Sequence, residues 1–214
     1  MPDQYYQFNL RRRALAGSID SQFSSELGLS FLSLKEILLK KKVDSDNPLY
    51  YLRDTHWNPR GASISEAAIA ERLRLIVGNP GFNVDHLNFV LRKKKAYTGD
   101  LASFNGATHL SEDILVAKPN NLLTLICVEA KFGNRSGIFK GGAEEMRILL
   151  VRDSFSEALV PFMSQRYSDI FSVWEYPSNA RMQELIEQVK PDIVIEQVVE
   201  REFLYFSGVP RTPL

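Results

Sequence analysis

Residues 147–156 of this 214-residue chain read Arg147-Ile148-Leu149-Leu150-Val151-Arg152-Asp153-Ser154-Phe155-Ser156. The apolar run 147–151 predicts a buried strand, and the amphipathic stretch 156–165 predicts a helix after it. Ser154 therefore lies at a strand-to-helix turn, where its hydroxyl projects above the edge of a sheet. Its own N–H joins the free amides at the start of the helix, and such amides can stabilise a developing oxyanion. The alternative is an ordinary N-cap serine, which is common at turns of this kind.

Around this turn, the second half of the chain alternates short apolar runs with amphipathic ones, as crossover units on a parallel sheet do. The predicted strands are 48–53, 122–129, 147–151, 169–174 and 192–198. The predicted helices are 29–42, 63–77, 156–165 and 179–190, the last stopped by Pro191. Ser63 and Glu66 have the spacing of a capping box, and the glycine-rich stretch 131–142 predicts a mobile loop. We expect an α/β fold, a three-layer sandwich with a mainly parallel sheet, in a single domain covering 1–214.

Charge and composition restrict the functional classes. Lys plus Arg number 26 and Asp plus Glu number 26, so no net field favours nucleic acid or an anionic membrane as a partner. No apolar run approaches the roughly 18 residues that a membrane span needs. The start of the chain lacks a basic segment followed by an apolar one, which predicts an unexported, cytoplasmic protein as the sequence is written. Cys127 lies in an apolar run and is expected in the core.

A serine nucleophile needs a base, and the chain has three histidines: His56, His86 and His109. His56 follows Asp54 by two positions, so a modest turn brings the carboxylate to one imidazole nitrogen and leaves the other for Ser154. The alternative is a surface aspartate and a partly buried histidine beside a core tryptophan. His86 is expected in a polar loop, and nothing near His109 is placed to orient it.

Three segments carry a family resemblance. Residues 54–62, Asp-Thr-His-Trp-Asn-Pro-Arg-Gly-Ala, resemble the D-x-H-W motif of the alginate O-acetyltransferase family with SGNH-hydrolase-like domains. Residues 98–102, Thr-Gly-Asp-Leu-Ala, resemble a Gly-Asp-Leu segment of these proteins, and residues 149–156 resemble their nucleophile strand and turn. The chain order Asp, His and, 98 positions later, Ser is also that of the family.

The resemblance implies a catalytic triad with Ser154 as nucleophile, His56 as general base and Asp54 as orienting carboxylate. It implies serine-dependent esterase or acyltransferase chemistry, with an acetyl group passed to water or to a polysaccharide or sugar hydroxyl, and a membrane acyltransferase as acyl donor. Neither a metal nor a cofactor is required by this chemistry, and no ligand cluster with metal spacing stands out in the sequence. Gly99 or Asn105 is a candidate second oxyanion donor.

Other residues are candidates for substrate contact. Arg152 stands where the common nucleophile motif has Gly, beside the reactive serine. Trp57, with Tyr97, Trp174 and Tyr176, offers an aromatic surface for sugar rings, although core packing is the more ordinary role of a strand-end Trp174.

Two questions stay open at the level of sequence. The resembled family usually has an exported segment, a periplasmic or cell-envelope location and an initial sheet strand upstream of anything present here. Either this chain is a shortened member that lacks the first strand, or its upstream part is missing. A catalytically inactive carbohydrate-binding or scaffold protein of the same fold is the alternative function. A phosphate-binding α/β module fits less well, because no glycine-rich phosphate loop is present.

Overall fold

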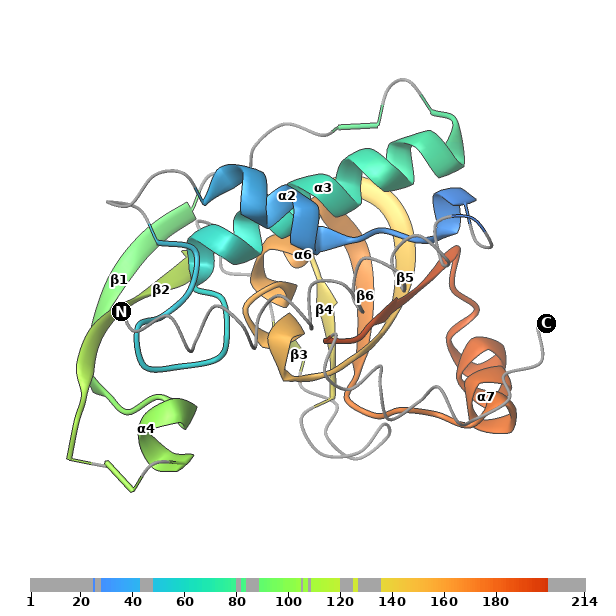
Figure 1. The fold of residues 1–214 in the computed structure, drawn as a ribbon. Helices are drawn as coiled ribbons and strands as arrows, with labels where there is room; N and C mark the ends of the chain where they lie inside the picture. The colour runs from blue at the N-terminus through green and yellow to red at the C-terminus, as the bar shows by residue number, and fades with distance from the viewer. Residues whose placement is uncertain are drawn as a thin grey trace.

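The computed structural model describes residues 25, 28–42, 48–79, 82–83, 89–104, 106–107, 109–119, 125–126 and 136–199. Figure 1 shows these residues as a sheet covered by helices, with a separate two-stranded ribbon to one side. Among them, no helix is long and apolar enough to cross a membrane. The expectation that the family's first strand is absent falls on the start of the chain, outside the described residues.

The main sheet has five strands in the order β3-β4-β6-β5-β7. Their bounds are Leu125–Ile126 (β3), Gly137–Lys140 (β4), Glu144–Arg152 (β5), Tyr167–Val173 (β6) and Ile193–Gln197 (β7). β5 runs parallel to both β6 and β7, whereas β4 is antiparallel to β6 and to β3. The sheet is therefore mixed: β5, β6 and β7 are parallel to one another, whereas β4 is antiparallel to both of its neighbours, so the prediction of a mainly parallel sheet is confirmed only in part.

The connections explain the mixture of directions. The parallel strands are joined by crossover helices, α6 (Val160–Arg166) between β5 and β6 and α7 (Asn179–Val189) between β6 and β7. β4 reaches β5 through residues 141–143 alone, too short for a crossover, so these strands run in opposite directions. The glycine-rich stretch 131–142, predicted to be a loop, thus contains β4, and its residues 131–135 lie outside the described part.

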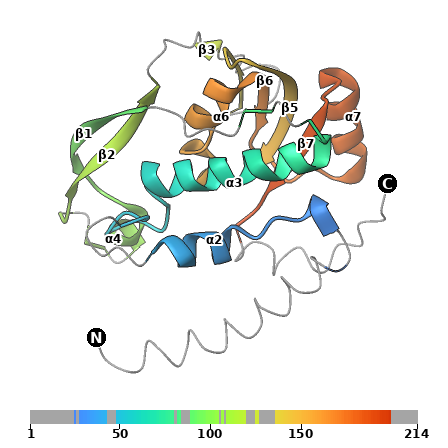
Figure 2. The ribbon, with the colours of Figure 1, turned by 90° about the horizontal axis from the view of Figure 1, so that it is seen from above.

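Helices cover both faces of the sheet (Figure 2). Side chains of β5 alternate between the two, as a strand buried on both sides requires. Ile148 and Leu150 belong to the core beneath α3 (Pro59–Val77) and α6, together with Phe162 and Tyr167. Leu149 and Val151 belong to the smaller core beneath α7. The three-layer arrangement expected from the sequence is present.

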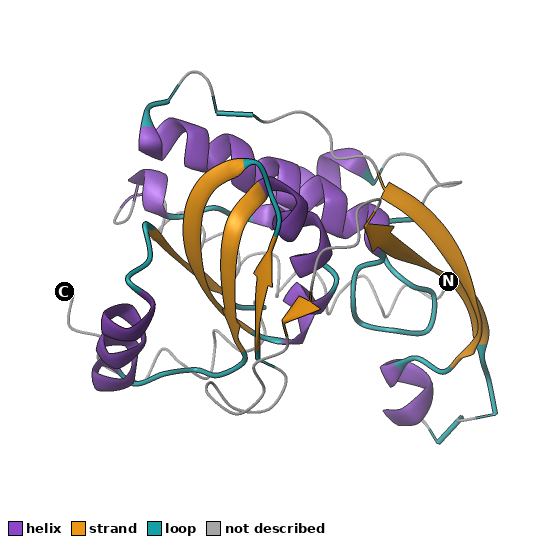
Figure 3. Ribbon diagram, turned by 180° about the vertical axis from the view of Figure 1, so that it is seen from behind, coloured by secondary structure: helices purple, strands orange, loops and turns teal. Residues whose placement is uncertain are grey.

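The ribbon of β1 (Phe89–Tyr97) and β2 (Glu112–Pro119) stands apart from the main sheet (Figures 1 and 3). Its strands are antiparallel, and Lys93 pairs with Asp113 across them at 2.7 Å. The sequence analysis predicted no strand here, because a ribbon with charged, exposed residues such as 92–95 lacks the apolar alternation that marks a sheet packed on a core. A short helix, α4 (Asp100–Phe104), follows β1.

Several helix boundaries differ from the predictions. α3 begins at Pro59 rather than at Ser63, because Asn58 is its N-cap: the Asn58 side chain accepts bonds from the N–H groups of Arg60 and Gly61. The predicted capping-box residue Glu66 instead lies inside the helix and is buried. The helix predicted over 29–42 is a 3-10 turn, η1 (Gly28–Ser30), followed by α2 (Leu34–Lys41). The helix predicted over 156–165 is likewise a 3-10 turn, η2 (Ser154–Glu157), followed by α6.

Candidate active site

The loop that carries Asp54 and His56 runs from residue 48 to residue 57, directly before α3. It returns on itself through an isolated bridge between Tyr50 and Trp57. The strand predicted over 48–53 is therefore wrong, since these residues pair with the loop's own return and not with a sheet. Gly61 in the first turn of α3 permits the fold-back, because a Cβ there would lie 2.4 Å from the carbonyl oxygen of Leu49.

The turn that carries Ser154 follows the carboxyl end of β5, as predicted for an open sheet with a ligand crevice at that edge. Asp153 shapes the turn. Its buried carboxylate accepts from the N–H of Phe155 at 2.8 Å and from the N–H of Val199 at 2.6 Å. The side chain of Ser156 donates to Gln197 at 2.7 Å. The turn is thus tied to the chain segment at and after the end of β7, which holds Ser154 in a fixed place.

These two segments bring Asp54, His56 and Ser154 into one hydrogen-bonded line. The Nδ1 atom of His56 lies 2.6 Å from Oδ1 of Asp54, and its Nε2 atom lies 2.7 Å from Oγ of Ser154. In the neutral imidazole, Nδ1–H donates to the carboxylate and Nε2 accepts from the serine hydroxyl. The His56 side chain is 26% exposed and that of Asp54 only 2%, so the line runs from the interior towards solvent.

The buried carboxylate of Asp54 is well supplied with donors. Besides the imidazole, it accepts from the backbone N–H of His56 at 2.8 Å and from the hydroxyl of Tyr97. Burial alone would raise the pKa of Asp54, but the hydrogen bonds from Tyr97 and His56 outweigh it and hold this pKa below its ordinary value. The carboxylate therefore stays ionised at neutral pH.

Asp100 and Tyr97 complete the hydrogen-bond network around Asp54 and His56. The sequence analysis predicted no role for either residue in this network. Asp100, at the start of α4, accepts from the N–H of Thr55 at 2.7 Å and from the Thr55 hydroxyl. Its Oδ2 lies 3.6 Å from Nδ1 of His56. Tyr97 is the last residue of β1. The available signal was the Gly-Asp-Leu segment around Asp100, where a carboxylate directly follows a glycine.

Asp54, His56 and Asp100 bring donor atoms within 4.8 Å of one another, a spacing that can hold a metal ion. In this structure the same atoms are committed to hydrogen bonds. The imidazole Nδ1 faces Asp54, and both oxygens of Asp100 accept from Thr55. The three side chains therefore belong to one hydrogen-bond network that includes Thr55.

Trp57 does not offer a surface to a sugar ring, which corrects that prediction. It is only 4% exposed, and its indole N–H donates to the carbonyl of Phe155 at 2.9 Å. The edge of its ring meets the Phe155 ring, which in turn lies against His56 with 4.6 Å between ring centroids. Trp57 therefore fixes loop 48–57 to the turn that carries Ser154; these are called the base loop and the nucleophile turn below, after the candidate roles of His56 and Ser154.

Arg152 is buried rather than open to a substrate. Its Nε donates to the hydroxyl of Ser172 at 3.0 Å, and its guanidinium lies over the ring of half-buried Trp174 at 4.6 Å. These contacts explain how the turn tolerates a long side chain in place of glycine. They give Arg152 and Trp174 a packing role beside the sheet.

Gly99 and Asn105 are the two candidate oxyanion donors, and the structure describes only Gly99. Gly99 packs on the base loop, where a Cβ would lie 1.9 Å from the carbonyl oxygen of Arg53 and 2.9 Å from Cβ of Asp54. It is therefore on the Asp54 side of the imidazole, and its place in the structure is explained by this close approach. Asn105 lies outside the described residues, as does His86. His109 is exposed in the segment before β2.

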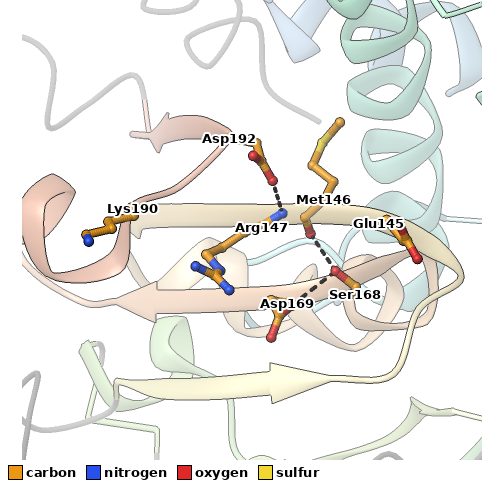
Figure 4. A pocket seen from close by; sticks show the side chains of 7 residues that line it. All are labelled: Glu145, Met146, Arg147, Ser168, Asp169, Lys190 and Asp192. Carbon is orange, nitrogen blue, oxygen red and sulfur yellow. Dashed lines mark hydrogen bonds between the residues drawn. The ribbon is translucent and has the colours of Figure 1, made fainter.

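A hollow of about 480 Å³ is lined by Arg147, Ser168, Asp169, Lys190, Asp192 and their neighbours (Figure 4). It lies at the amino end of β5, whereas Ser154 follows the carboxyl end of the same strand. Its polar groups are largely paired with one another: Asp192 accepts from the N–H of Arg147 at 2.7 Å, and Ser168 donates to the carbonyl of Met146 at 3.1 Å. The hollow is separate from the candidate active site.

The α/β fold and a family match together place the chain among SGNH hydrolase-like domains of the acetyltransferase type. Residues 18–200 match the family described as SGNH hydrolase-like domain, acetyltransferase AlgX, and the chain belongs to this family. The resemblance seen in the sequence motifs is confirmed. No curated protein matches the chain.

Two solved structures with TM-scores above 0.5 share the fold of this chain but little of its sequence. A DHHW family protein from Eubacterium siraeum is 13% identical with a TM-score of 0.53, and the match covers 72% of this chain and 60% of that protein. PatB1 from Bacillus cereus is 14% identical with a TM-score of 0.54, covering 77% and 67% respectively. The O-acetyltransferase domain of Pseudomonas putida AlgJ is 16% identical with a TM-score of 0.44, covering 91% and 63%. The chain thus spans less than two thirds of the length of the Eubacterium protein.

Proposed function

We propose that this chain is a serine-dependent O-acyl transferase or esterase that forms an acyl intermediate on Ser154. The observation that carries the proposal is the continuous hydrogen-bonded line from Asp54 through His56 to Ser154, with 2.6 Å and 2.7 Å between the bonded atoms. Membership of an acetyltransferase family supports acetyl as the transferred group and a sugar hydroxyl as its acceptor.

In the proposed first step, Oγ of Ser154 attacks the ester carbonyl carbon while its proton passes to Nε2 of His56. Asp54 holds the imidazole in the required tautomer and stabilises the imidazolium. Collapse of the tetrahedral intermediate breaks the ester C–O bond, and His56 returns the proton to the leaving oxygen. In the second step, water or a sugar hydroxyl gives its proton to Nε2 of His56 and attacks the acyl carbonyl carbon. The bond between this carbon and Oγ then breaks, and His56 returns the proton to Oγ, which regenerates Ser154.

The developing oxyanion needs donors in this scheme. We assign one to the N–H of Ser154, by analogy with other acyl-transfer sites. The N–H of Phe155 does not fill this role, since it donates to Asp153 at 2.8 Å. Asn105 stays a prediction for the second donor.

The test is hydrolysis of p-nitrophenyl acetate by purified variants. Ser154→Ala and His56→Ala should each abolish turnover to a similar degree, and the double variant should lose little more, because the two residues act as a unit. Asp54→Asn should reduce turnover less than Ser154→Ala, because the carboxylate makes no bond to the substrate. The matched control is His109→Ala, which removes an exposed histidine and should retain wild-type activity.

A fluorophosphonate probe separates the enzyme from an inactive carbohydrate-binding or scaffold protein of the same fold. The wild type should be labelled on Ser154, and Ser154→Ala should not be labelled. Folded wild-type protein that neither reacts with the probe nor hydrolyses the ester would contradict the proposal and favour the binding function. With an acetyl donor and a sugar acceptor present together, the mass of the acetylated product distinguishes transfer from hydrolysis.

A further inference from the structure

The end of β1 has an irregular backbone beside the candidate active site. The pairing of β1 with β2 shifts register between Lys94 and Tyr97, and Ala96 within this bulge has φ of 52°. A left-handed conformation is unfavourable for a residue with a Cβ and persists only where surrounding contacts hold it. Bulges of this kind redirect the side chains beside them. Here the next side chain along the strand is Tyr97.

Tyr97 contacts the carboxylate of the proposed triad. Its hydroxyl donates to Oδ2 of Asp54, while Oδ1 of the same carboxylate faces the imidazole of His56. The carboxylate is therefore held from both oxygens. The ring of Tyr97 packs against the ring of Tyr51, with 5.7 Å between ring centroids, a contact that does not involve the Tyr51 hydroxyl.

Asp100 holds the backbone between the two triad members. Thr55 stands between Asp54 and His56, and both its N–H and its hydroxyl donate to the carboxylate of Asp100. Gly99 makes this approach possible, because any Cβ at that position would overlap the carbonyl of Arg53. The second carboxylate also lies close to the base, 3.6 Å from Nδ1 of His56.

We propose that Tyr97 and Asp100 are positioning residues for the general base: Tyr97 fixes the orientation of the Asp54 carboxylate, and Asp100 fixes Thr55 and adds a second negative charge beside His56. This inference rests on the function proposed above. Neither residue needs to contact the substrate. The bulged end of β1 and the start of α4 thus form a support for the base loop, supplied by the ribbon that stands apart from the main sheet.

The charged and titratable groups around His56 give the two residues opposite electrostatic effects. Among the described residues, Asp54 and Asp100 face one side of the imidazole and Ser154 the other, while Tyr97 acts through Asp54. Tyr51, Lys94 and Glu112 lie further out. Tyr51 and the ammonium of Lys94 lie against the Tyr97 ring, and Glu112 accepts from the backbone N–H of Arg53. Removing the charge of Asp100 leaves the imidazolium less stabilised. Removing the Tyr97 hydroxyl leaves more of the Asp54 charge on the oxygen that faces His56.

The experiment compares Tyr97→Phe and Asp100→Asn with two matched controls. Tyr51→Phe removes a hydroxyl that donates to the carbonyl of Leu115, and Asp169→Asn removes a partly buried carboxylate that pairs with Lys140. Each test variant should lower kcat for p-nitrophenyl acetate about tenfold with KM nearly unchanged, as expected for loss of one hydrogen bond to a charged group. The controls should stay close to wild type.

The decisive readout is the pH dependence. The acid limb of kcat/KM should move to lower pH in Asp100→Asn and to higher pH in Tyr97→Phe, each by about half a unit for a partly solvated site. The proton NMR signal of the His56 Nδ1–H, which bonds to Asp54, should also move in both variants when it is measured in a Ser154→Ala background. That measurement requires no turnover, so it tests the positioning role even if the proposed reaction fails.

Two results would overturn the inference. One is an Nδ1–H signal of His56 that is unchanged in both variants. The other is a loss of activity that only parallels a loss of thermal stability, with no movement of the acid limb. Failure of the proposed function has a different signature, since Ser154→Ala would then keep the esterase activity of the wild type.

Discussion

Breaking the buried ion pair between α3 and α6 is expected to destabilise the whole domain. Glu66 and Arg166 form two hydrogen bonds, at 2.6 Å and 3.0 Å, and both side chains are only 2% exposed. α3 directly follows the base loop, and α6 directly follows the nucleophile turn. The pair therefore connects the two segments that together form the candidate site.

The magnitude follows from the burial. Glu66→Leu leaves the Arg166 charge buried without its carboxylate, which typically costs about 3–5 kcal/mol. A domain of this size has about 5–15 kcal/mol of stability in total, so the loss is a large fraction of it. The corresponding decrease in Tm is about 6–20 °C.

Urea unfolding followed by circular dichroism measures this change. The matched control is Glu71→Leu, which removes an exposed carboxylate paired with Arg74 on the same helix and should unfold close to wild type. The double variant Glu66→Leu/Arg166→Met should recover much of the loss, because no unpaired charge is left. If Glu66→Leu and Glu71→Leu unfold at the same urea concentration, the buried ion pair does not stabilise the domain as proposed.

Three further outcomes are expected. Gly99→Ala should strongly reduce esterase activity, because its Cβ would lie 1.9 Å from the carbonyl oxygen of Arg53 and would displace the base loop; normal kinetics would refute this. Trp57→Phe should unfold about 1–3 kcal/mol more easily than wild type in urea, since it loses a buried hydrogen bond to Phe155 and leaves space; an unchanged midpoint would count against this anchor. The pKa of Asp54 is lowered in the folded protein, so its ionised form contributes stability that is fully present above its ordinary value near 3.8 and is lost as pH falls through the lower folded value. The advantage of wild type over Asp54→Asn in urea should therefore shrink below about pH 4, and a constant difference down to pH 2 would contradict the assignment.

The local sequence was sufficient to predict those elements and residues whose pattern is contained within one short segment. The apolar run 147–151 lies within a strand buried on both faces, so its hydrophobicity predicted β5 independently of its neighbours. The helix predicted over 179–190 is present as α7, whose end is marked by Lys190 in a left-handed conformation before Pro191. Residue type and spacing were also sufficient to select Asp54, His56 and Ser154 as candidates, because an i, i+2 pair and a serine turn are local features.

Strand direction, side-chain exposure and long-range hydrogen-bond partners could be determined only from the tertiary structure. The sequence contains no local signal for strand direction, which the short connection after β4 and the crossovers through α6 and α7 decide. Trp57 is a residue type that can stack on a sugar ring, but the packing of the base loop against Phe155 places it in the interior. Tyr97 and Asp100 are more than 40 positions from Asp54, and the bulged end of a charged ribbon outside the main sheet brings them to it. Sequence alone thus determined the chemical groups available for catalysis, whereas the long-range contacts decided which of them meet, because hydrogen bonds depend on distances that separation along the chain does not specify.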